Sequence, residues 1–325
     1  MKFLITGCGG FIGFHLSLYL LKNKKKVYGI DTINNYYKRE LKLKRLKILK
    51  KLKNFYFEKI DISNKKKLDS FFDKNNIDYI VNLAAYAGVQ YSLKNPAIYF
   101  KTNEIGFYNL LENAKRKNIK KILFASSSSV AGNSNSNVFS EFDNTDSPIS
   151  LYAATKKNNE ILAHFYAVNY KIKIIGVRFF TVYGPYGRPD LSIFKFTQAI
   201  KNNKILELYN NGYHFRDFTF INDAIKCLVK LINLREFHKL DRQNNAYFQI
   251  FNLGGGEKVK ITTVVKILEK LLKKKAAVKK APMRKGDIVF SRSSTKKLYR
   301  NIKYYPKTKI QNGLKLFVDW FKDEV

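Results

Sequence analysis

The chain is long enough for one large domain or two modest ones, and its composition is that of a folded protein. It has 325 residues, of which 45 % are hydrophobic, with 26 Phe and 21 Tyr. This supply of apolar side chains excludes intrinsic disorder for most of the chain. The net charge of +36 would suit nucleic acid or an anionic membrane as a partner. Because lysine is spread along the whole chain, we interpret the charge as a background bias and expect neither partner.

Cysteine usage and hydropathy exclude further classes of protein. Cys8 and Cys227 form no disulfide framework and no metal-ligand spacing, so we expect a reducing, cytoplasmic setting and no bound metal. No apolar run approaches the roughly 18 residues of a membrane span. Met1 and Lys2 are followed at once by an apolar run and a glycine turn, which is not the pattern of a signal peptide.

Apolar segments alternate with amphipathic ones along the first 180 residues or so. We predict buried strands at residues 3–5, 27–30, 55–60, 77–84, 121–126 and 172–179. Helices are predicted between the third and fourth strands and at residues 11–21, 97–117 and 152–170, with a later one at 261–272. Strands alternating with helices predict an α/β fold with a doubly wound parallel sheet.

Residues 38–53 are both basic and amphipathic. Leucines recur there at near-helical spacing, with lysine and arginine between them, at Leu41, Leu46, Leu49 and Leu52. Such a helix could lie on a membrane or on RNA. We interpret it instead as a helix whose leucines face the core and whose lysines are solvated.

A glycine-rich turn, TGCGGFIG, joins the first predicted strand to the first helix. Gly7 permits a tight turn, Gly10 the close approach of a pyrophosphate, and Gly13 close packing of helix on strand. The phosphates would lie at the helix N-terminus, where free N–H groups favour an anion. Asp31 ends the next strand, and its carboxylate would bind the adenosine ribose and repel a 2′-phosphate. We therefore predict NAD, and not NADP, as the cofactor.

A tyrosine and a lysine form a second motif, together with four consecutive serines, residues 126–129, that precede them in the chain. Tyr152 and Lys156 are four residues apart, so a helix places them on one face. A cationic lysine beside a phenol lowers the pKa of the tyrosine from about 10. Such a tyrosine could take a proton from a sugar hydroxyl while a hydride leaves the same carbon. A serine among residues 126–129, at the end of a predicted strand, could hydrogen-bond the reacting oxygen.

These motifs resemble those of the extended short-chain dehydrogenases/reductases, and in particular the UDP-glucuronate 4-epimerases. The resemblance covers the whole chain and is carried by residues 5–13, 27–37, 82–96, 125–130, 150–157, 178–190, 194–197 and 216–221. It implies a Rossmann-type NAD-binding domain made of residues 1–180 plus about 217–253. A smaller C-terminal α/β domain, which would bind the nucleotide sugar, would comprise about 181–216 and 254–325.

The resemblance also implies roles for individual residues. Tyr152 would be the catalytic base and acid, Lys156 its partner and a ribose ligand, and Ser127 the residue that binds the reacting hydroxyl. Tyr152 and Lys156 would contact NAD together with Gly7, Gly10, Phe11, Ile12, Gly13, Asp31, Asn34, Asp61, Ile62, Leu83, Ala84, Ala85, Asn103 and Phe179. The expected substrate-binding set is Ser127, Ser128, Ser129, Thr181, Arg188, Phe194, Arg216, Arg284 and Asp287.

The family mechanism implies oxidation at C4 by tightly held NAD, rotation of the 4-keto sugar and return of the hydride to its other face. Because the intermediate is a β-keto acid that loses CO₂ readily, neutral donors should hold its carboxylate, and Ser128, Ser129 and Thr181 meet that need. Related decarboxylases usually have Glu at position 129, and related 4,6-dehydratases have Asp-Glu at 128–129. Arg188, Arg216 and Arg284 would bind the pyrophosphate or the uronate carboxylate, and Asp287 would bind the uridine ribose.

Three positions depart from the epimerase pattern. Gln90 stands where these enzymes usually have Arg, Tyr86 where Gln is common, and Ala131 where Tyr is usual. Arg284, by contrast, matches a phosphate-binding Arg of UDP-galactose 4-epimerases. The alternative enzyme is therefore a 4-epimerase of a neutral UDP-hexose, UDP-glucose or UDP-N-acetylglucosamine, and the non-enzymatic alternative is a nucleic-acid-binding protein on the same fold.

The resemblance implies an assembly and a pathway as well. Relatives often dimerise through a helix pair that would include residues 152–170, so we expect a homodimer built on a four-helix bundle. The reaction would feed the synthesis of a surface polysaccharide.

Overall fold

A parallel sheet of seven strands lies at the centre of the computed structural model, which describes residues 1–132, 138–238, 247–284 and 287–324. The strand order is β11-β6-β5-β4-β1-β2-β3, so the order reverses between β1 and β4, the switch point of a doubly wound sheet. Every neighbouring pair of these strands is parallel. The strands are β1 (Lys2–Thr6), β2 (Lys26–Asp31), β3 (Phe55–Lys59), β4 (Tyr79–Asn82), β5 (Lys121–Ser127), β6 (Lys173–Phe179) and β11 (Phe248–Leu253).

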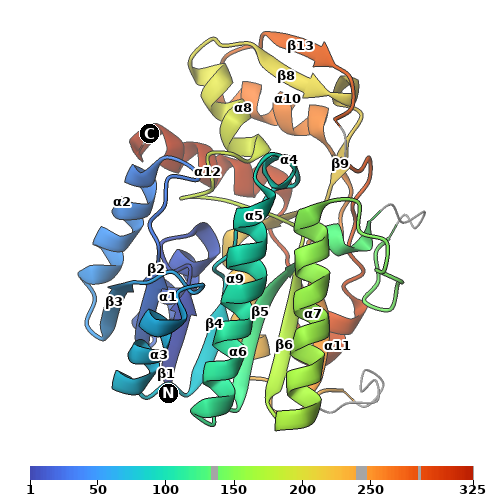
Figure 1. Ribbon diagram of the computed structural model, residues 1–325. Coiled ribbons are helices and arrows are strands. Elements are labelled where there is room, and N and C mark those ends of the chain that lie inside the picture. The colour runs from blue at the N-terminus through green and yellow to red at the C-terminus, as the bar shows by residue number, and fades with distance from the viewer. Residues whose placement is uncertain (133–137, 239–246, 285–286, 325) are drawn as a thin grey trace.

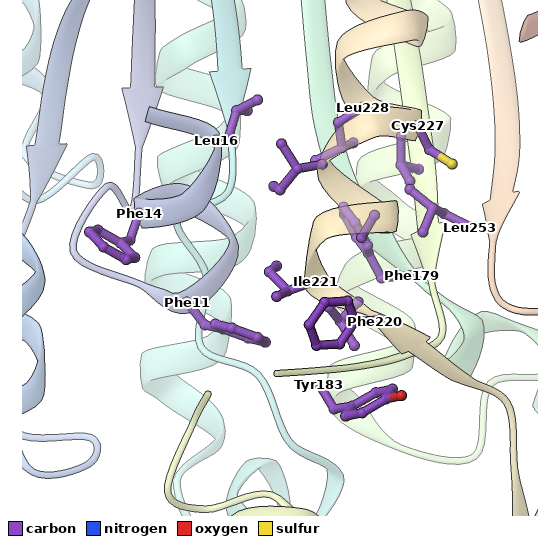
Figure 2. Close-up of a cluster of buried hydrophobic side chains, with 14 of the residues drawn as sticks. Phe11, Phe14, Leu16, Phe179, Tyr183, Phe220, Ile221, Cys227, Leu228 and Leu253 are labelled. Atoms are coloured by element: carbon purple, nitrogen blue, oxygen red, sulfur yellow. The ribbon is translucent and has the colours of Figure 1, made fainter. Parts of the chain in front are cut away.

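Helices cover both faces of the sheet (Figure 1). The apolar side chains of each layer form a separate core against the strands. The first layer consists of α3 (Lys65–Lys74), α6 (Gly106–Arg116) and α7 (Leu151–Tyr170). The second consists of α1 (Phe11–Lys22), α2 (Arg39–Lys50) and α9 (Ile221–Ile232). Figure 2 shows Phe11 of α1 together with Ile221 and Leu228 of α9 in this second core. The predicted doubly wound α/β fold is confirmed.

Most predicted elements agree with the structure to within a few residues. The helix predicted at 97–117 is a continuous helical segment in three parts: α5 (Pro96–Tyr99), the π-helical η1 (Phe100–Ile105) and α6. The strand predicted at 77–84 ends earlier, at Asn82, because the chain there leaves the sheet at the switch point. In α2, Leu46 and Leu49 are buried, so the prediction that the leucines of this basic helix face the core is confirmed for these two. The prediction that its lysines are solvated is wrong for Lys42, which is buried because its ammonium donates to the Asn34 carbonyl at 2.9 Å.

α8 (Ser192–Lys201), β8 (Leu206–Tyr209), α10 (Ile261–Leu272) and β13 (Val278–Ala281) lie beyond the carboxyl ends of the sheet strands, at the top of Figure 1. No helix in the described ranges has both the length and the apolar character needed to cross a membrane. The proposed division into two domains stays a prediction. The remaining elements are α4 (Val89–Lys94), η2 (Ser128–Ala131), β7 (Thr181–Tyr183), α8 (Ser192–Lys201), β8 (Leu206–Tyr209), η3 (Asn210–Gly212), β9 (Phe215–Arg216), β10 (Phe218–Phe220), β12 (Val259–Lys260), α10 (Ile261–Leu272), β13 (Val278–Ala281), α11 (Lys296–Ile302) and α12 (Ile310–Glu324).

A buried ion pair joins α7 to the two strands beside it. The guanidinium of Arg178 on β6 donates two hydrogen bonds of 2.8 Å to the carboxylate of Glu160 on α7. Ser126 on β5 donates to the same carboxylate at 2.6 Å. The side chains of Arg178 and Glu160 are only 7 % and 6 % exposed. One carboxylate thus fixes the helix that carries Tyr152 against the strand that carries Ser127.

We predict that Glu160→Ala lowers the free energy of unfolding by roughly 3–5 kcal/mol, because it leaves the Arg178 guanidinium buried without its counter-charge. Urea denaturation measures the change. The double variant Glu160→Leu, Arg178→Met removes both charges and should recover most of the loss. A Glu160→Ala protein as stable as the wild type would show that the pair does not hold α7 in place.

Candidate active site

A cavity of about 1050 Å³ opens at the switch point, beyond the carboxyl ends of β1, β4 and their neighbours. Residues at the carboxyl ends of six strands, β1 to β6, and residues of the later loops contribute to its wall. Of the predicted site residues, those that line it are Gly7, Gly10, Phe11, Ile12, Gly13, Asp31, Asn34, Asp61, Ile62, Leu83, Ala84, Ala85, Ser127, Ser128, Ser129, Tyr152, Lys156, Phe179, Thr181, Arg188 and Arg284. The fold therefore brings the glycine turn, the Tyr–Lys pair and the serines into one space.

Two predicted residues lie behind the cavity wall. Asn103 is 1 % exposed, and its amide donates to the Tyr86 carbonyl at 3.0 Å and to the Thr155 hydroxyl at 3.1 Å. It therefore supports the wall where we expected a cofactor contact. Phe194 is also buried, and its ring packs in an aromatic cluster with Phe317, Trp320 and Phe321.

Two more predicted residues, Arg216 and Asp287, lie outside the cavity lining. Asp287 directly follows residues 285–286 in the chain, which are outside the described residues. The Arg216 guanidinium donates to the carbonyls of Phe215 and Val289, at 2.9 and 3.2 Å. Burial lowers the pKa of Arg216, and the nearby carboxylate of Asp287 opposes that shift. A substrate contact for this pair stays a prediction.

The glycine turn brings α1 and β1 closer together than side chains would allow. A Cβ at Gly13 would lie 2.2 Å from the carbonyl oxygen of Gly7, and Gly7 itself has φ of +69°. Helix α1 begins at Phe11 with no side-chain cap and no acidic residue in its first turn. Its first N–H groups and the positive end of its dipole therefore remain available to an anion, such as a pyrophosphate, in the cavity.

Asp31 is held in place at the end of β2 by two backbone N–H groups. Its carboxylate accepts from Gly9 at 3.0 Å and from Ile33 at 2.8 Å. Burial raises the pKa of Asp31, whereas the Ile33 N–H and Lys42 oppose the shift. Each carboxylate oxygen keeps a further lone pair for a ribose hydroxyl, so the residue fits the role predicted from the sequence.

Tyr152, Lys156 and Ser127 all line the cavity. Ser150 caps α7 by accepting from the N–H of Ala153 at 3.1 Å, so Tyr152 lies in the first turn and Lys156 one turn later. Ser127 ends β5. The Lys156 ammonium is buried and donates to the carbonyl of Ala125, on β5, at 2.8 Å. The helix cap and the strand end together place the three side chains.

The electrostatics of this group differ from the sequence prediction. Burial raises the pKa of Tyr152, and the Ser127 hydroxyl and Arg188 only partly oppose the shift. Burial also lowers the pKa of Lys156 to about 8. The expected lowering of the Tyr152 pKa by Lys156 is therefore wrong for this structure, because desolvation outweighs the neighbouring charge and the lysine points its ammonium at Ala125.

Arg188 is held by contacts that no sequence pattern indicates. Its guanidinium pairs with Asp190 through contacts of 3.0 and 2.5 Å and donates to the Ala87 carbonyl at 3.0 Å. Burial alone would lower the pKa of Arg188, but the Asp190 carboxylate raises it. The ring of Tyr36 lies 5.5 Å from the same guanidinium. Tyr36 belongs to the stretch 27–37 that carries the family resemblance.

The part of the cavity around Ser128, Ser129 and Thr181 presents hydroxyl groups. Among the described residues of the cavity lining, the carboxylates are Asp31, Asp61 and Asp190, and Asp190 is paired with Arg188. Within the same described ranges, no three His, Cys, Asp or Glu side chains gather in a way that could hold a metal. This part of the cavity can therefore bind a carboxylate through neutral donors.

We predict that Lys156 makes the protein more stable as the pH rises from about 8 to about 10.5. The unfolded lysine keeps its proton up to about 10.5, whereas the folded one loses it above about 8. In that window the unfolded state binds more protons, so each pH unit adds up to about 1.4 kcal/mol to the free energy of unfolding. The measurement is the difference between wild type and Lys156→Met in urea denaturation. A difference that is constant with pH would contradict the low pKa.

Comparisons with known proteins agree with this geometry. Residues 4–317 match the family model described as GDP-mannose 4,6 dehydratase. Protein CapI of Staphylococcus aureus is 42 % identical over 99 % of this chain and 98 % of its own length. A probable UDP-glucuronate 4-epimerase of Rhizobium meliloti is 37 % identical over 99 % and 97 %. The solved UDP-glucuronic acid 4-epimerase of Bacillus cereus, in complex with UDP-glucuronic acid and NAD, is 32 % identical over all of both chains, with a TM-score of 0.89. This chain therefore belongs to the extended short-chain dehydrogenase/reductase family, in the group that contains the UDP-glucuronate 4-epimerases.

Proposed function

We propose that this protein is an NAD-dependent isomerase that converts UDP-glucuronate to UDP-galacturonate by epimerisation at C4. The observation that carries the proposal is one cavity that holds the glycine turn, the Ser127–Tyr152–Lys156 group and a wall of hydroxyl groups. Relatives described as UDP-glucuronate 4-epimerases support it, as does the similar structure that contains UDP-glucuronic acid and NAD.

The residues of the cavity fit NAD. The free N–H groups of α1 would bind the pyrophosphate, and Asp31 would bind the adenosine ribose, with Asp61 and Ile62 beside the adenine. Lys156 would bind the second ribose, and Phe179 would lie near the nicotinamide. When bound, NAD supplies the acceptor for the hydride that leaves C4 and returns it later.

Tyr152 would take the proton of the C4 hydroxyl and return it when the sugar has turned. Ser127 would orient the same oxygen through a hydrogen bond. Because burial raises the pKa of Tyr152, formation of the phenolate needs cations near it. Arg188 already opposes the shift, and Lys156 lies one helical turn away on α7.

The hydroxyl groups of Ser128, Ser129 and Thr181 would hold the carboxylate of the sugar. A β-keto acid loses CO₂ readily, and a neutral hydroxyl donor can bind the carboxylate without supplying the charge or the proton that would assist its loss. Since the only carboxylate of the described lining on this side, Asp190, is paired with Arg188, elimination chemistry lacks its general acid.

We also propose the setting and the assembly of the enzyme. Cys8 and Cys227 are free and buried, which fits the reducing cytoplasm, and the product would feed a surface polysaccharide. A homodimer is supported by apolar side chains that α7 and its neighbours leave exposed. They are Phe100, Ile105, Tyr108, Ile161, Phe165 and Val168, on helices that lie side by side in Figure 1.

Incubation of the purified protein with UDP-glucuronate, without added NAD, should give UDP-galacturonate, which proton NMR detects. The Tyr152→Phe variant should retain its bound NAD and lose at least about 10²-fold in rate, because it lacks the proton acceptor. A UDP-pentose would mean that the serines fail to protect the carboxylate. Gln90 and Arg284, both in the cavity lining, favour a neutral hexose, so a higher kcat/KM for UDP-glucose than for UDP-glucuronate would overturn the proposed substrate.

For the assembly, we predict that Ile161→Glu together with Phe165→Glu converts the dimer to a monomer. The two side chains are 56 % and 50 % exposed, so a charge costs little in the monomer but much in a buried interface. Light scattering after size exclusion measures the mass. Lys171→Glu, at the far end of the same helix, serves as a charge-matched control. A wild type that is monomeric at all concentrations would refute the assembly.

A further inference from the structure

Arg45 is a buried arginine that has no role in the proposed reaction. It lies on α2 and is 0 % exposed. Its guanidinium donates to the Gly9 carbonyl at 2.8 Å and to the Tyr37 hydroxyl at 2.7 Å. It also donates to the carbonyls of Tyr186 at 2.7 Å and Gly187 at 3.3 Å. Fully buried arginines are rare, so this set of contacts needs a reason.

The contacts of Arg45 join two segments that are far apart in the sequence. Gly9 belongs to the glycine turn, and its N–H donates to Asp31 at 3.0 Å. Gly187 directly precedes Arg188. One planar guanidinium therefore connects the turn that would bind the dinucleotide with the loop that carries the arginine of the sugar site.

The loop of residues 184–190 is held in place by contacts with Arg45 and with α1. Tyr186 has φ of +57°, a backbone conformation that side chains other than glycine rarely adopt. The Arg45 guanidinium donates to the Tyr186 carbonyl, and the Tyr186 ring packs on Phe14 and Trp320. His15 on α1 donates to the Pro185 carbonyl at 2.9 Å. The loop is thus attached to the glycine turn and to the helix that follows it.

The position of this loop decides where the Arg188 charge lies. Arg188 is held by Asp190 and by the Ala87 carbonyl, and it opposes the raised pKa of Tyr152. A shift of the loop would move Arg188 relative to the phenol and to an anionic ligand. Displacements of about 1 Å in such positioning cost up to about 100-fold in rate.

We propose that Arg45 is a positioning residue that couples the two halves of the cavity, because it sets the glycine turn and the Arg188 loop at a fixed separation. Arginine suits this role because its planar fork offers five N–H donors, enough for three carbonyls and a phenol at once. A lysine has three N–H donors on one nitrogen, so it could reach only some of these four acceptors. The proposal rests on the proposed function for the identity of the two ligands.

The experiment compares Arg45→Met, which keeps the length of the side chain, with Arg45→Lys, which keeps the charge. Arg45→Met should lose bound NAD during purification and raise the Kd for UDP-glucuronate roughly 10-fold or more, and Arg45→Lys should recover part of both. Asp223→Asn is the control, since Asp223 is buried and its partners, Tyr304, Lys307 and Thr308, lie outside the cavity lining. At a similar loss in Tm it should leave NAD content and the Kd unchanged.

A double-mutant cycle with Arg188→Ala separates positioning from a general loss of stability. If Arg45 acts through Arg188, Arg45→Met should raise the Kd for UDP-glucuronate less than about 2-fold in the Arg188→Ala background. Fully additive effects, or an unchanged Kd in Arg45→Met, would overturn the proposal. If Arg45→Met does not fold, Tyr37→Phe replaces it in the cycle with Arg188→Ala. This variant removes one hydrogen-bond partner of the Arg45 guanidinium, so smaller effects of the same sign are expected. Because these readouts measure binding, they do not depend on which product the enzyme forms. A wild type that does not bind UDP-glucuronate would refute the proposed function, and the content of bound NAD would then test Arg45 by itself.

Discussion

The close contact between α1 and β1 at the glycine turn is the constraint on which the rest of the site depends. A Cβ at Gly13 would lie 2.2 Å from the Gly7 oxygen, so only glycine lets the helix begin this near the strand. That position directs the helix N-terminus at the switch point, beyond the carboxyl ends of the neighbouring strands β1 and β4. The Gly9 carbonyl, held by Arg45, and the Gly9 N–H, held by Asp31, fix the same turn from both sides.

Burial of charge is the second feature that unites the molecule. Arg45, Lys156 and Arg178 are buried cations, and each donates hydrogen bonds to carbonyls or to a carboxylate. Of the Arg45 nitrogens, Nε has no partner among the described residues. Desolvation of these groups costs free energy, and only hydrogen bonds of correct geometry offset that cost. They therefore hold helices and loops in one register, which an apolar core of equal volume would specify less sharply. The same desolvation controls the pKa values of Tyr152 and Lys156.

The residues that we expect to set substrate choice lie in the cavity wall, apart from this framework. The hydroxyls of Ser128, Ser129 and Thr181 suit a uronate, whereas Gln90 removes a cation that these epimerases usually have. Tyr86, another departure, accepts a hydrogen bond from Asn34 at 2.9 Å, and its backbone is held by Asn103. The wall of the cavity can thus change its chemistry while the glycine turn, α7 and the buried cations stay in place.

The sequence alone determined the features that depend on neighbours in the chain. Alternating strands and helices, the glycine turn and the spacing of Tyr152 and Lys156 are local patterns, and the doubly wound parallel sheet, NAD and the family followed from them. Only the tertiary structure decided which distant groups meet. Asn103 supports the wall, Phe194 joins an aromatic cluster, and Arg45, one cation among many in a basic helix, connects two loops. The pKa of Tyr152 is likewise set by burial, a sum over segments that no local pattern contains.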